Sequence, residues 1–397
     1  MPTVSTAAAR ARASTPGAST PARKRARRAS NRVSASSSTA TASPAVGTRR
    51  VYELSKKGDI SNLRLVERPR QALAPNEARV RVKAIGLNFA DVFTALGLYS
   101  AAPDGAFVPG LECSGVVEEL GADASGALEV GDAVMCVTRF GAFGDEITCP
   151  ATQIRKLPKG WSFEEGASFL VQGLTSFYGL KRLGDIKKGS VVLVHSAAGG
   201  CGLMALGICE RVGAKAIAVI GNKVKVDTLK ERFPSLKAII VRDRKRFDEQ
   251  VRDACDAVRA KEGVDIVLDA TLGDFFQGGW DALSRGGRYV VYGAADLTPQ
   301  GDRIGIIGWI KLALKFLRRK KVDPLMLPGE NKGILGFNLI WQFDRTEDLA
   351  SLLGDLQALD LPAPKVGATF DFAELPDALR LFQTGKTTGK VVVKVSD

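Results

Sequence analysis

A glycine-rich turn directly after an apolar run is the clearest candidate for chemistry in this sequence. The run Val191–Val194 is followed two residues later by Ala197-Ala198-Gly199-Gly200-Cys201-Gly202, which reads A-x-G-x-x-G, a variant of the dinucleotide-binding fingerprint. Gly199 lets the backbone approach a pyrophosphate, and Gly202 permits close packing of the next helix on the strand. We therefore predict that a dinucleotide is bound by Ala198, Gly199, Gly200, Cys201 and Gly202. A tight structural turn is the alternative.

The end of the next apolar strand indicates which dinucleotide is bound. This strand ends at Ile220, where an NAD-specific site needs a carboxylate for the ribose 2′-hydroxyl. Residues 221–227 read Gly-Asn-Lys-Val-Lys-Val-Asp, with no carboxylate at the strand tip. Ammonium groups and an amide suit a 2′-phosphate, so the sequence predicts NADPH, held by Asn222 and Lys225. In the alternative, Lys223 and Lys225 are solvated residues at a helix start.

The sequence around this loop shows two different hydrophobic patterns of β-strands. From about Val51 to Cys149, short strands of period two, such as 79–83, are separated by Gly, Pro and Asp, which is typical of a compact antiparallel β domain. From about Gln172, near-continuous apolar strands alternate with helix-length segments, which indicates a parallel sheet covered on both faces. These strands are predicted at 191–194, 216–220, 238–241, 264–268 and 289–292, and 334–339 is the candidate sixth.

The order of the elements predicts an α/β fold in which a doubly wound domain is inserted into a split β-rich domain. The doubly wound, NADPH-binding part is expected at 172–336. The β-rich catalytic part is expected at 49–171 and 337–397. With 45% hydrophobic residues, the chain has the composition of a globular protein with room for two such cores.

The basic charge of the chain belongs to its first fifty residues. They hold ten Lys and Arg and no acid, so the other 347 residues carry 46 bases against 43 acids, which gives no reason to expect nucleic-acid binding. Residues 1–48 are rich in Ala, Ser, Thr and Arg, which predicts a disordered transit peptide, for a plastid ahead of a mitochondrion. The alternatives are nuclear import through 22–28 and an untargeted basic tail on a cytoplasmic protein.

Several short stretches stand in the order and spacing of a known family. They are Gly86–Asp91, Val108–Gly115, Val194–Gly202 and Lys332–Leu339. From about Val51 onward, over roughly 345 residues, the chain resembles the medium-chain dehydrogenase/reductase superfamily and its zinc-independent quinone oxidoreductase group. The last stretch is similar to the branch of the vesicle amine transport protein. The resemblance implies a GroES-like catalytic domain, an inserted Rossmann domain and a homodimer.

The zinc-dependent members of that superfamily hold their catalytic metal with Cys, His and Cys. At the matching positions this chain has Asn88, Leu111 and Gln172. Zinc favours thiolate and imidazole, which two amides and an isobutyl group cannot replace. The four closely spaced cysteines of the structural zinc lobe are also missing, so the sequence predicts that no metal is bound.

Without a Lewis acid, substrates that accept hydride readily are favoured over simple alcohols. The resemblance implies the same substrates: quinones, or enals and enones that are reduced at the β-carbon. It also implies roles for Asn88, which would hydrogen-bond the substrate carbonyl or a cofactor ribose, and for Tyr99, which would line the pocket and donate a proton. Solvent is the alternative proton source. A turn-capping amide and a rim aromatic are the structural alternatives for these two residues.

The resemblance further implies contacts to the cofactor from residues outside the loop. Gln172 and Thr175 would lie near the nicotinamide, as would the backbone at Gly293 and at Phe337 and Asn338. Lys390 would reach a ribose or the phosphates, and a surface ammonium is its alternative. The single histidine, His195, enters the phosphate loop from a strand and is expected to be structural rather than catalytic.

A basic amphipathic segment spans 304–321. Ile307, Ile310, Leu314 and Leu317 recur at helical spacing, and lysines and an arginine share another face. The apolar part is too short to cross a bilayer. We expect this helix to cap a pocket or pack on a partner subunit; weak contact with an anionic membrane surface and a solvated helix are the alternatives. The rival to a reductase is therefore an NADPH-binding, membrane-associated interaction protein with little turnover.

Overall fold

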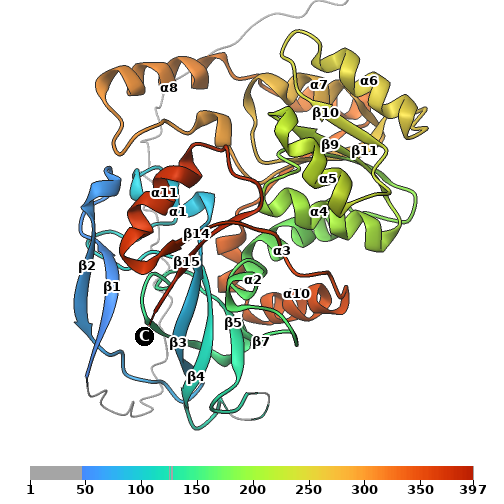
Figure 1. Cartoon of the computed structure of the whole chain (residues 1–397). Helices are drawn as coiled ribbons and strands as arrows, with labels where there is room; N and C mark the ends of the chain where they lie inside the picture. Colours follow the sequence, from blue (N-terminus) through green and yellow to red (C-terminus); the bar gives the residue numbers. More distant parts are fainter. Residues whose placement is uncertain (1–46, 125, 127, 397) are drawn as a thin grey trace, which may run out of the picture. The chain divides into compact units, whose positions relative to one another are not determined.

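The computed structural model of the chain describes residues 47–124, 126 and 128–396 (Figure 1). The predicted targeting segment at 1–48 lies almost wholly outside these residues and stays a prediction. Within the described residues, no helix combines the length and the apolarity that crossing a membrane requires.

Six parallel strands form the first sheet, in the order β10-β9-β8-β11-β12-β13. They are β8 (Val191–Val194), β9 (Lys215–Ile220), β10 (Ala238–Val241), β11 (Val264–Asp269), β12 (Leu283–Val291) and β13 (Gly333–Gly336). The helices between them are α4 (Gly200–Val212), α5 (Val226–Arg232), α6 (Phe247–Ala257), α7 (Phe276–Asp281), α8 (Ile306–Arg318) and α9 (Leu327–Glu330). The strand order reverses at β8, so the carboxyl end of β8 is a topological switch point, where ligands bind in folds of this kind.

A second sheet of seven strands is mainly antiparallel, with the order β14-β15-β3-β4-β5-β7 and with β6 paired to β3. Its strands are β3 (Glu77–Gly86), β4 (Glu112–Leu120), β5 (Ala133–Val137), β6 (Glu146–Pro150), β7 (Ile154–Lys156), β14 (Val366–Asp371) and β15 (Lys390–Lys394). Strand β15, from the end of the chain, pairs with β3. This sheet is therefore built from the segments that precede and follow the parallel sheet in the sequence, as the sequence predicts. Strands β1 (Thr48–Leu54) and β2 (Leu63–Pro69) form a separate hairpin.

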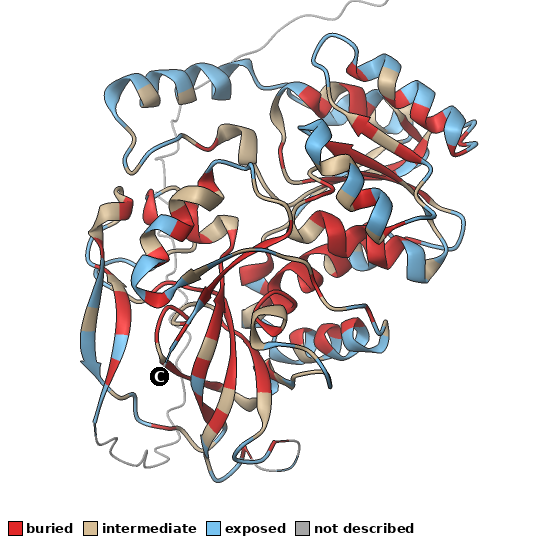
Figure 2. Cartoon of the chain, viewed as in Figure 1, coloured by how far each residue is buried: buried red, intermediate tan, exposed pale blue. Residues whose placement is uncertain are grey.

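The remaining helices pack around these sheets. They are α1 (Phe89–Ala95), α2 (Phe163–Gly166), α3 (Leu170–Phe177), α10 (Thr346–Ala358) and α11 (Leu375–Gln383). Buried residues line both sheets and the helices that touch them (Figure 2). One apolar cluster joins β5, through Met135 and Val137, to α3, α4 and α10, so the two sheets share part of a core. The domain boundaries expected at 171/172 and 336/337 stay a prediction.

Candidate functional site

The glycine loop follows β8 at the switch point and leads into α4. Gly202 can only be glycine, because a Cβ there would lie 2.4 Å from the carbonyl oxygen of Ser196. Gly199 is the extended residue before α4, and its N–H donates to the same Ser196 oxygen at 2.8 Å. The first N–H groups of a helix have no acceptor within it, so this turn presents donors and no side chain to an anion. The geometry fits a pyrophosphate.

The C-terminal segment before β15 runs beside this loop. The N–H of Gly389 donates to the oxygen of Ala198 at 2.9 Å, and Gly389 forms a parallel bridge with Gly199. The ammonium of Lys225 donates to the oxygens of Thr387 at 2.7 Å and Gly385 at 3.3 Å. Burial, and then the charge of Arg242, lowers the pKa of Lys225. This predicted phosphate-binding residue therefore ties the segment to the tip of β9, and one of its three N–H donors is left for a phosphate.

A second cation at the tip of β9 was missed by the sequence analysis. Arg242 directly follows β10, and a Cβ placed on Gly221 would lie 3.5 Å from its Nε. Its guanidinium carbon lies 4.7 Å from the ring centre of Phe275, and its Nη2 is 3.7 Å from Asp296. The Asn222 side chain accepts from Val224 N at 3.1 Å and caps the turn at the strand tip. An arginine after the third parallel strand was the signal that could have found this site.

The other candidate residues meet in a buried cluster of Asn88, Glu112 and Lys390. The Lys390 ammonium contacts the Oε1 of Glu112 at 2.5 Å and donates to the Oδ1 of Asn88 at 2.7 Å. Lys390 is only 3% exposed and Glu112 1%. The Oε2 of Glu112 accepts the N–H of Val171 at 3.0 Å. The alternative of a surface ammonium for Lys390 is therefore wrong, since the ammonium is half of a core ion pair.

This cluster fixes the Asn88 amide in one orientation. Its Nδ2 donates to Glu112 at 3.1 Å and to the oxygen of Gly86 at 3.3 Å, so both amide protons are in use. Its oxygen accepts from Lys390 and keeps a second lone pair. Of the two expected roles for Asn88, donation to a substrate carbonyl thus requires a broken bond, whereas acceptance from a ribose hydroxyl does not.

Asp91 lies beneath the same cluster and is 2% exposed. Its carboxylate accepts the backbone N–H of Asn88 at 2.7 Å and so holds the first turn of α1. Burial raises the pKa of Asp91 to about 7, and Glu112 adds to this rise, while Lys390 opposes it. The folded protein therefore holds a proton on Asp91 at pH values where the unfolded chain has lost it.

The raised pKa of Asp91 predicts a loss of stability with rising pH. Between pH 4 and pH 7 the native state binds more protons than the unfolded chain at this group, so the free energy of unfolding should fall by up to about 4 kcal/mol. Asp91→Asn, which stays neutral, should be more stable than wild type at pH 8 and lose this advantage at pH 5. Urea unfolding at both values checks this, with the exposed Asp253→Asn as control; an equal effect of Asp91→Asn at both values would contradict it.

Tyr99 and Asn338 come together from distant parts of the sequence. The Tyr99 hydroxyl donates to the Oδ1 of Asn338 at 2.9 Å. Burial raises the pKa of Tyr99 to about 12, so the phenol keeps its proton at neutral pH. Phe337 packs between Tyr178 and Tyr292, with ring centres 5.0 and 6.1 Å apart. All four aromatic residues pack against the apolar cluster that includes α3, and Asn338 holds the Tyr99 hydroxyl.

Gln172 and Thr175 lie on α3, against the start of α4. The Nε2 of Gln172 donates to the oxygen of Ser168, while its buried Oε1 has no hydrogen-bond partner among the described residues. A Cβ on Gly200 would lie 1.8 Å from that Oε1. Thr175 turns its hydroxyl to the Val171 oxygen at 2.7 Å. Gln172 thus offers an unpaired acceptor beside the glycine loop, and Thr175 is satisfied within its helix.

Three further residues lie in the same region. A Cβ on Gly293 would lie 2.7 Å from the oxygen of Ala270, so glycine is needed there. Burial raises the pKa of the Cys201 thiol to about 11, which leaves it protonated. His195 is fully buried, and burial lowers its pKa, so it is neutral in the core at physiological pH. Its position supports the expected structural role.

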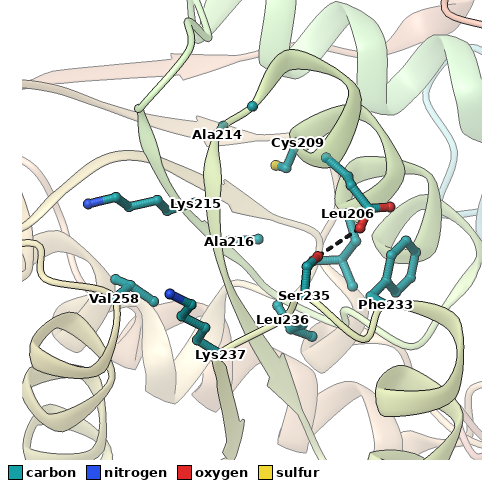
Figure 3. A pocket seen from close by; sticks show the side chains of 12 residues that line it. Leu206, Cys209, Ala214, Lys215, Ala216, Phe233, Ser235, Leu236, Lys237 and Val258 are labelled. Carbon is teal, nitrogen blue, oxygen red and sulfur yellow. Dashed lines mark hydrogen bonds between the residues drawn. The ribbon is translucent and has the colours of Figure 1, made fainter.

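A surface pocket lies at the amino ends of the parallel strands β9 and β10, whereas the glycine loop follows the carboxyl end of β8 (Figure 3). Lys215 at the amino end of β9 and Lys237 just before β10 line it. On one side the Ser235 hydroxyl donates to Glu210 at 2.7 Å. None of the predicted site residues lines this pocket, so it is separate from the candidate site.

The positions that match the metal ligands of zinc-dependent dehydrogenases lie in the candidate site. Asn88 contacts the Lys390 ammonium, and Leu111 belongs to the apolar cluster around α3. In the part of the chain that the structure describes, no three or more His, Cys, Asp or Glu gather as a group that could hold a metal ion.

Comparisons with known proteins agree with this arrangement. Residues 74–159 match the family model described as an alcohol dehydrogenase GroES-like domain, and residues 242–393 match the model of a zinc-binding dehydrogenase. The synaptic vesicle membrane protein VAT-1 homolog of Rattus norvegicus is 31% identical over 343 residues, which cover 85% of this chain and 81% of that protein. The chain belongs to the medium-chain dehydrogenase/reductase superfamily, in the branch of the VAT-1 homologues. The resemblance and the split GroES-like and Rossmann fold predicted from the sequence are thereby confirmed.

Solved structures of the superfamily share the fold over most of the chain. A mycobacterial protein, Rv1454c, complexed with NADPH has a TM-score of 0.73 and 26% identity, covering 87% of this chain and 99% of that one. The CurK enoyl reductase has a TM-score of 0.70 and 28% identity, with 88% and 99% covered. A mycobacterial quinone oxidoreductase has a TM-score of 0.69 and 26% identity, with 87% and 99% covered.

Proposed function

We propose that this protein is an NADPH-dependent, zinc-independent oxidoreductase that reduces a quinone or the β-carbon of an α,β-unsaturated carbonyl. One observation carries the proposal: Gly389 binds the glycine loop at Ala198, and the next residue, Lys390, enters the cluster with Asn88 and Glu112. The expected pyrophosphate site and the expected reaction site are thus joined by two adjacent residues. The solved structures with NADPH, an enoyl reductase and a quinone oxidoreductase support this function.

The residues present fit NADPH along its length. The glycine loop would hold the pyrophosphate, and Asn222 and Arg242 flank the strand tip where a 2′-phosphate would lie. The unpaired Oε1 of Gln172 suits an amide donor such as a carboxamide near Gly200. When bound, NADPH supplies the hydride.

The side chains of the site would orient the reactants and hold a proton. Asn88, fixed by Lys390 and Glu112, would accept a hydrogen bond from a cofactor ribose. Tyr99 keeps its phenolic proton at neutral pH. Once its hydrogen bond to Asn338 is broken, the Tyr99 hydroxyl can donate a hydrogen bond or the proton itself to the reduced substrate. Because quinones and enones need little electrophilic help, positioning and one proton source suffice.

NADPH oxidation with a panel of quinones, enals and enones tests the proposal. We expect turnover of at least one class by wild type. Gly202→Ala should abolish NADPH binding and turnover, because its Cβ would lie 2.4 Å from the backbone oxygen of Ser196 and displace the glycine loop. Gly207→Ala in the same helix is the control, since its Cβ meets only an ordinary contact at 3.5 Å. Failure of the wild type to bind NADPH would refute the cofactor as well as the reaction.

A second candidate is an NADPH-binding, membrane-associated interaction protein with little turnover, which the exposed apolar helix α8 favours. The same panel separates the two, because this protein would bind NADPH without oxidising it. A homodimer remains the proposed assembly on the strength of the family resemblance.

A further inference from the structure

The surface pocket at the amino ends of β9 and β10 has no part in the proposed reaction. Its volume is about 360 Å³, within the range of small-molecule sites. Small residues leave this space open: Gly213 and Ala214 form the turn from α4 into β9, and Ala216 lies on β9 itself. Gly213 has φ +76°, the left-handed conformation that favours glycine at the end of a helix. Larger side chains at 214 and 216 would fill the pocket.

The floor of the pocket is apolar and is built from the helices around it. The floor side chains are Leu206 and Cys209 of α4, Phe233 at the end of α5 and Val258 at the end of α6, and all four are buried. Burial raises the pKa of the Cys209 thiol to about 12, so the thiol stays protonated and behaves as an apolar group. The floor therefore offers contacts to a compact apolar group.

Positive charge gathers on one side of the pocket. Lys215, which begins β9, and Lys237, just before β10, both reach to this side, whereas Ser235 lies on the other (Figure 3). Among the residues that the structure describes, the Lys237 ammonium has no hydrogen-bond or ion-pair partner. The Lys215 ammonium has only the oxygen of Arg259, at 3.5 Å. Both groups therefore have N–H donors available to an anion.

The acceptors that could repel an anion are already hydrogen-bonded. Glu210, the one acid among the lining residues, accepts the Ser235 hydroxyl at 2.7 Å, on the side away from the lysines. At the end of α4, the backbone oxygen of Glu210 accepts the N–H of Gly213 at 3.1 Å, and that of Cys209 accepts the N–H of Ala214 at 2.8 Å. The pocket thus combines an apolar floor with a positive side, and two bases in its lining oppose one acid.

We propose that this pocket binds a small organic anion that consists of a carboxylate on a compact apolar body. The carboxylate would accept hydrogen bonds from Lys215 and Lys237, and the apolar body would lie on the floor against Leu206 and Phe233. Both halves of the ligand are needed, because exposed ammonium groups alone hold an anion weakly in water. The site goes beyond the proposed reductase function and does not rest on it, since no residue of the candidate site lines the pocket.

Calorimetric titration of the full chain with 4-phenylbutyrate tests this site. We expect 4-phenylbutyrate to bind, with an affinity that falls as sodium chloride screens the lysines. The neutral 4-phenylbutan-1-ol lacks the carboxylate and acetate lacks the apolar body, so each should bind at least about tenfold more weakly. Equal binding of the alcohol or of acetate would overturn the proposal, because one half of the ligand would then suffice. The absence of 4-phenylbutyrate binding would overturn it as well.

Two changes in the pocket locate the bound carboxylate. Lys215→Gln with Lys237→Gln should lower the affinity for 4-phenylbutyrate at least about tenfold, because two charge-assisted hydrogen bonds are lost. Ala216→Leu should do the same with every charge in place, since the added atoms fill the pocket. The matched control is Lys245→Gln with Lys261→Gln, which removes exposed ammonium groups elsewhere on this part of the chain and should bind like wild type.

Thermal unfolding followed by circular dichroism shows that each of these variants is folded. The first fifty residues carry ten bases and could attract the same anion without any pocket. Binding of that kind would survive both the lysine changes and the filling of the pocket. Binding that survives either change therefore overturns the proposal, because the carboxylate is then held elsewhere.

Discussion

Lys390→Met is expected to lower the free energy of unfolding by about 3–5 kcal/mol, because it leaves the Glu112 carboxylate unpaired in the core. Lys390 and Glu112 are 3% and 1% exposed, and their charged atoms are 2.5 Å apart. Solvent cannot replace the lost partner without opening the contact between β15 and the glycine loop. Urea unfolding followed by circular dichroism measures the effect.

Two control variants show whether the buried pair is the cause. Glu112→Gln combined with Lys390→Met removes both charges and should recover most of the loss, since no unpaired ion remains. Lys394→Met, in the same strand, breaks the ion pair of Lys394 with Glu164. Because the Lys394 side chain is 54% exposed, this change should lower the free energy of unfolding by less than about 1 kcal/mol. If Lys390→Met and Lys394→Met destabilise the protein equally, the Lys390 pair does not hold the cluster together.

The parallel sheet was predictable because burial on both faces forces apolar runs. Strand β8 coincides with the predicted 191–194, and the other central strands differ by one residue at most. The exception is β12, which begins at Leu283 rather than at Tyr289. Its first half contains Gly286 and Gly287 and does not have the period of a strand, and its pairing with β11 shifts register between Val264 and Ile266. The candidate sixth strand ends at Gly336, because Leu339–Asp344 turn into a 3-10 helix.

The candidate site was predictable only where it is local in sequence. The glycine loop needs six consecutive residues, and its geometry follows from their type. The Glu112–Lys390 pair joins residues 278 apart, and nothing in the sequence shows that the lysine at the start of the final strand is buried. Arg242 was missed for a similar reason, since only the parallel pairing of β9 with β10 brings it beside Gly221.

Arg242→Ala is expected to weaken NADPH binding about 100-fold and to leave NADH binding nearly unchanged. This prediction rests on the proposed cofactor: hydrogen bonds to a charged phosphate contribute about 1.5–3 kcal/mol, and NADH lacks the 2′-phosphate that would receive them.

The contacts of Arg242 explain why it should dominate over Lys225. Its guanidinium is stacked on Phe275, and its Nη2 lies 3.7 Å from the carboxylate of Asp296. This ion pair is too long for a hydrogen bond, so the guanidinium can bind a phosphate instead. Lys225 is already bonded to Thr387 and Gly385, so Lys225→Glu should weaken NADPH binding less than Arg242→Ala and also loosen the C-terminal segment.

Fluorescence titration of each variant with both nucleotides measures the ratio of the two affinities. Lys230→Ala, an exposed cation on α5, is the matched control and should leave the ratio unchanged. A parallel fall in the affinities for NADPH and NADH would show that Arg242 supports the strand tip instead of reading the phosphate. If neither Arg242→Ala nor Lys225→Glu changes the affinity for NADPH, the 2′-phosphate does not bind at this strand end.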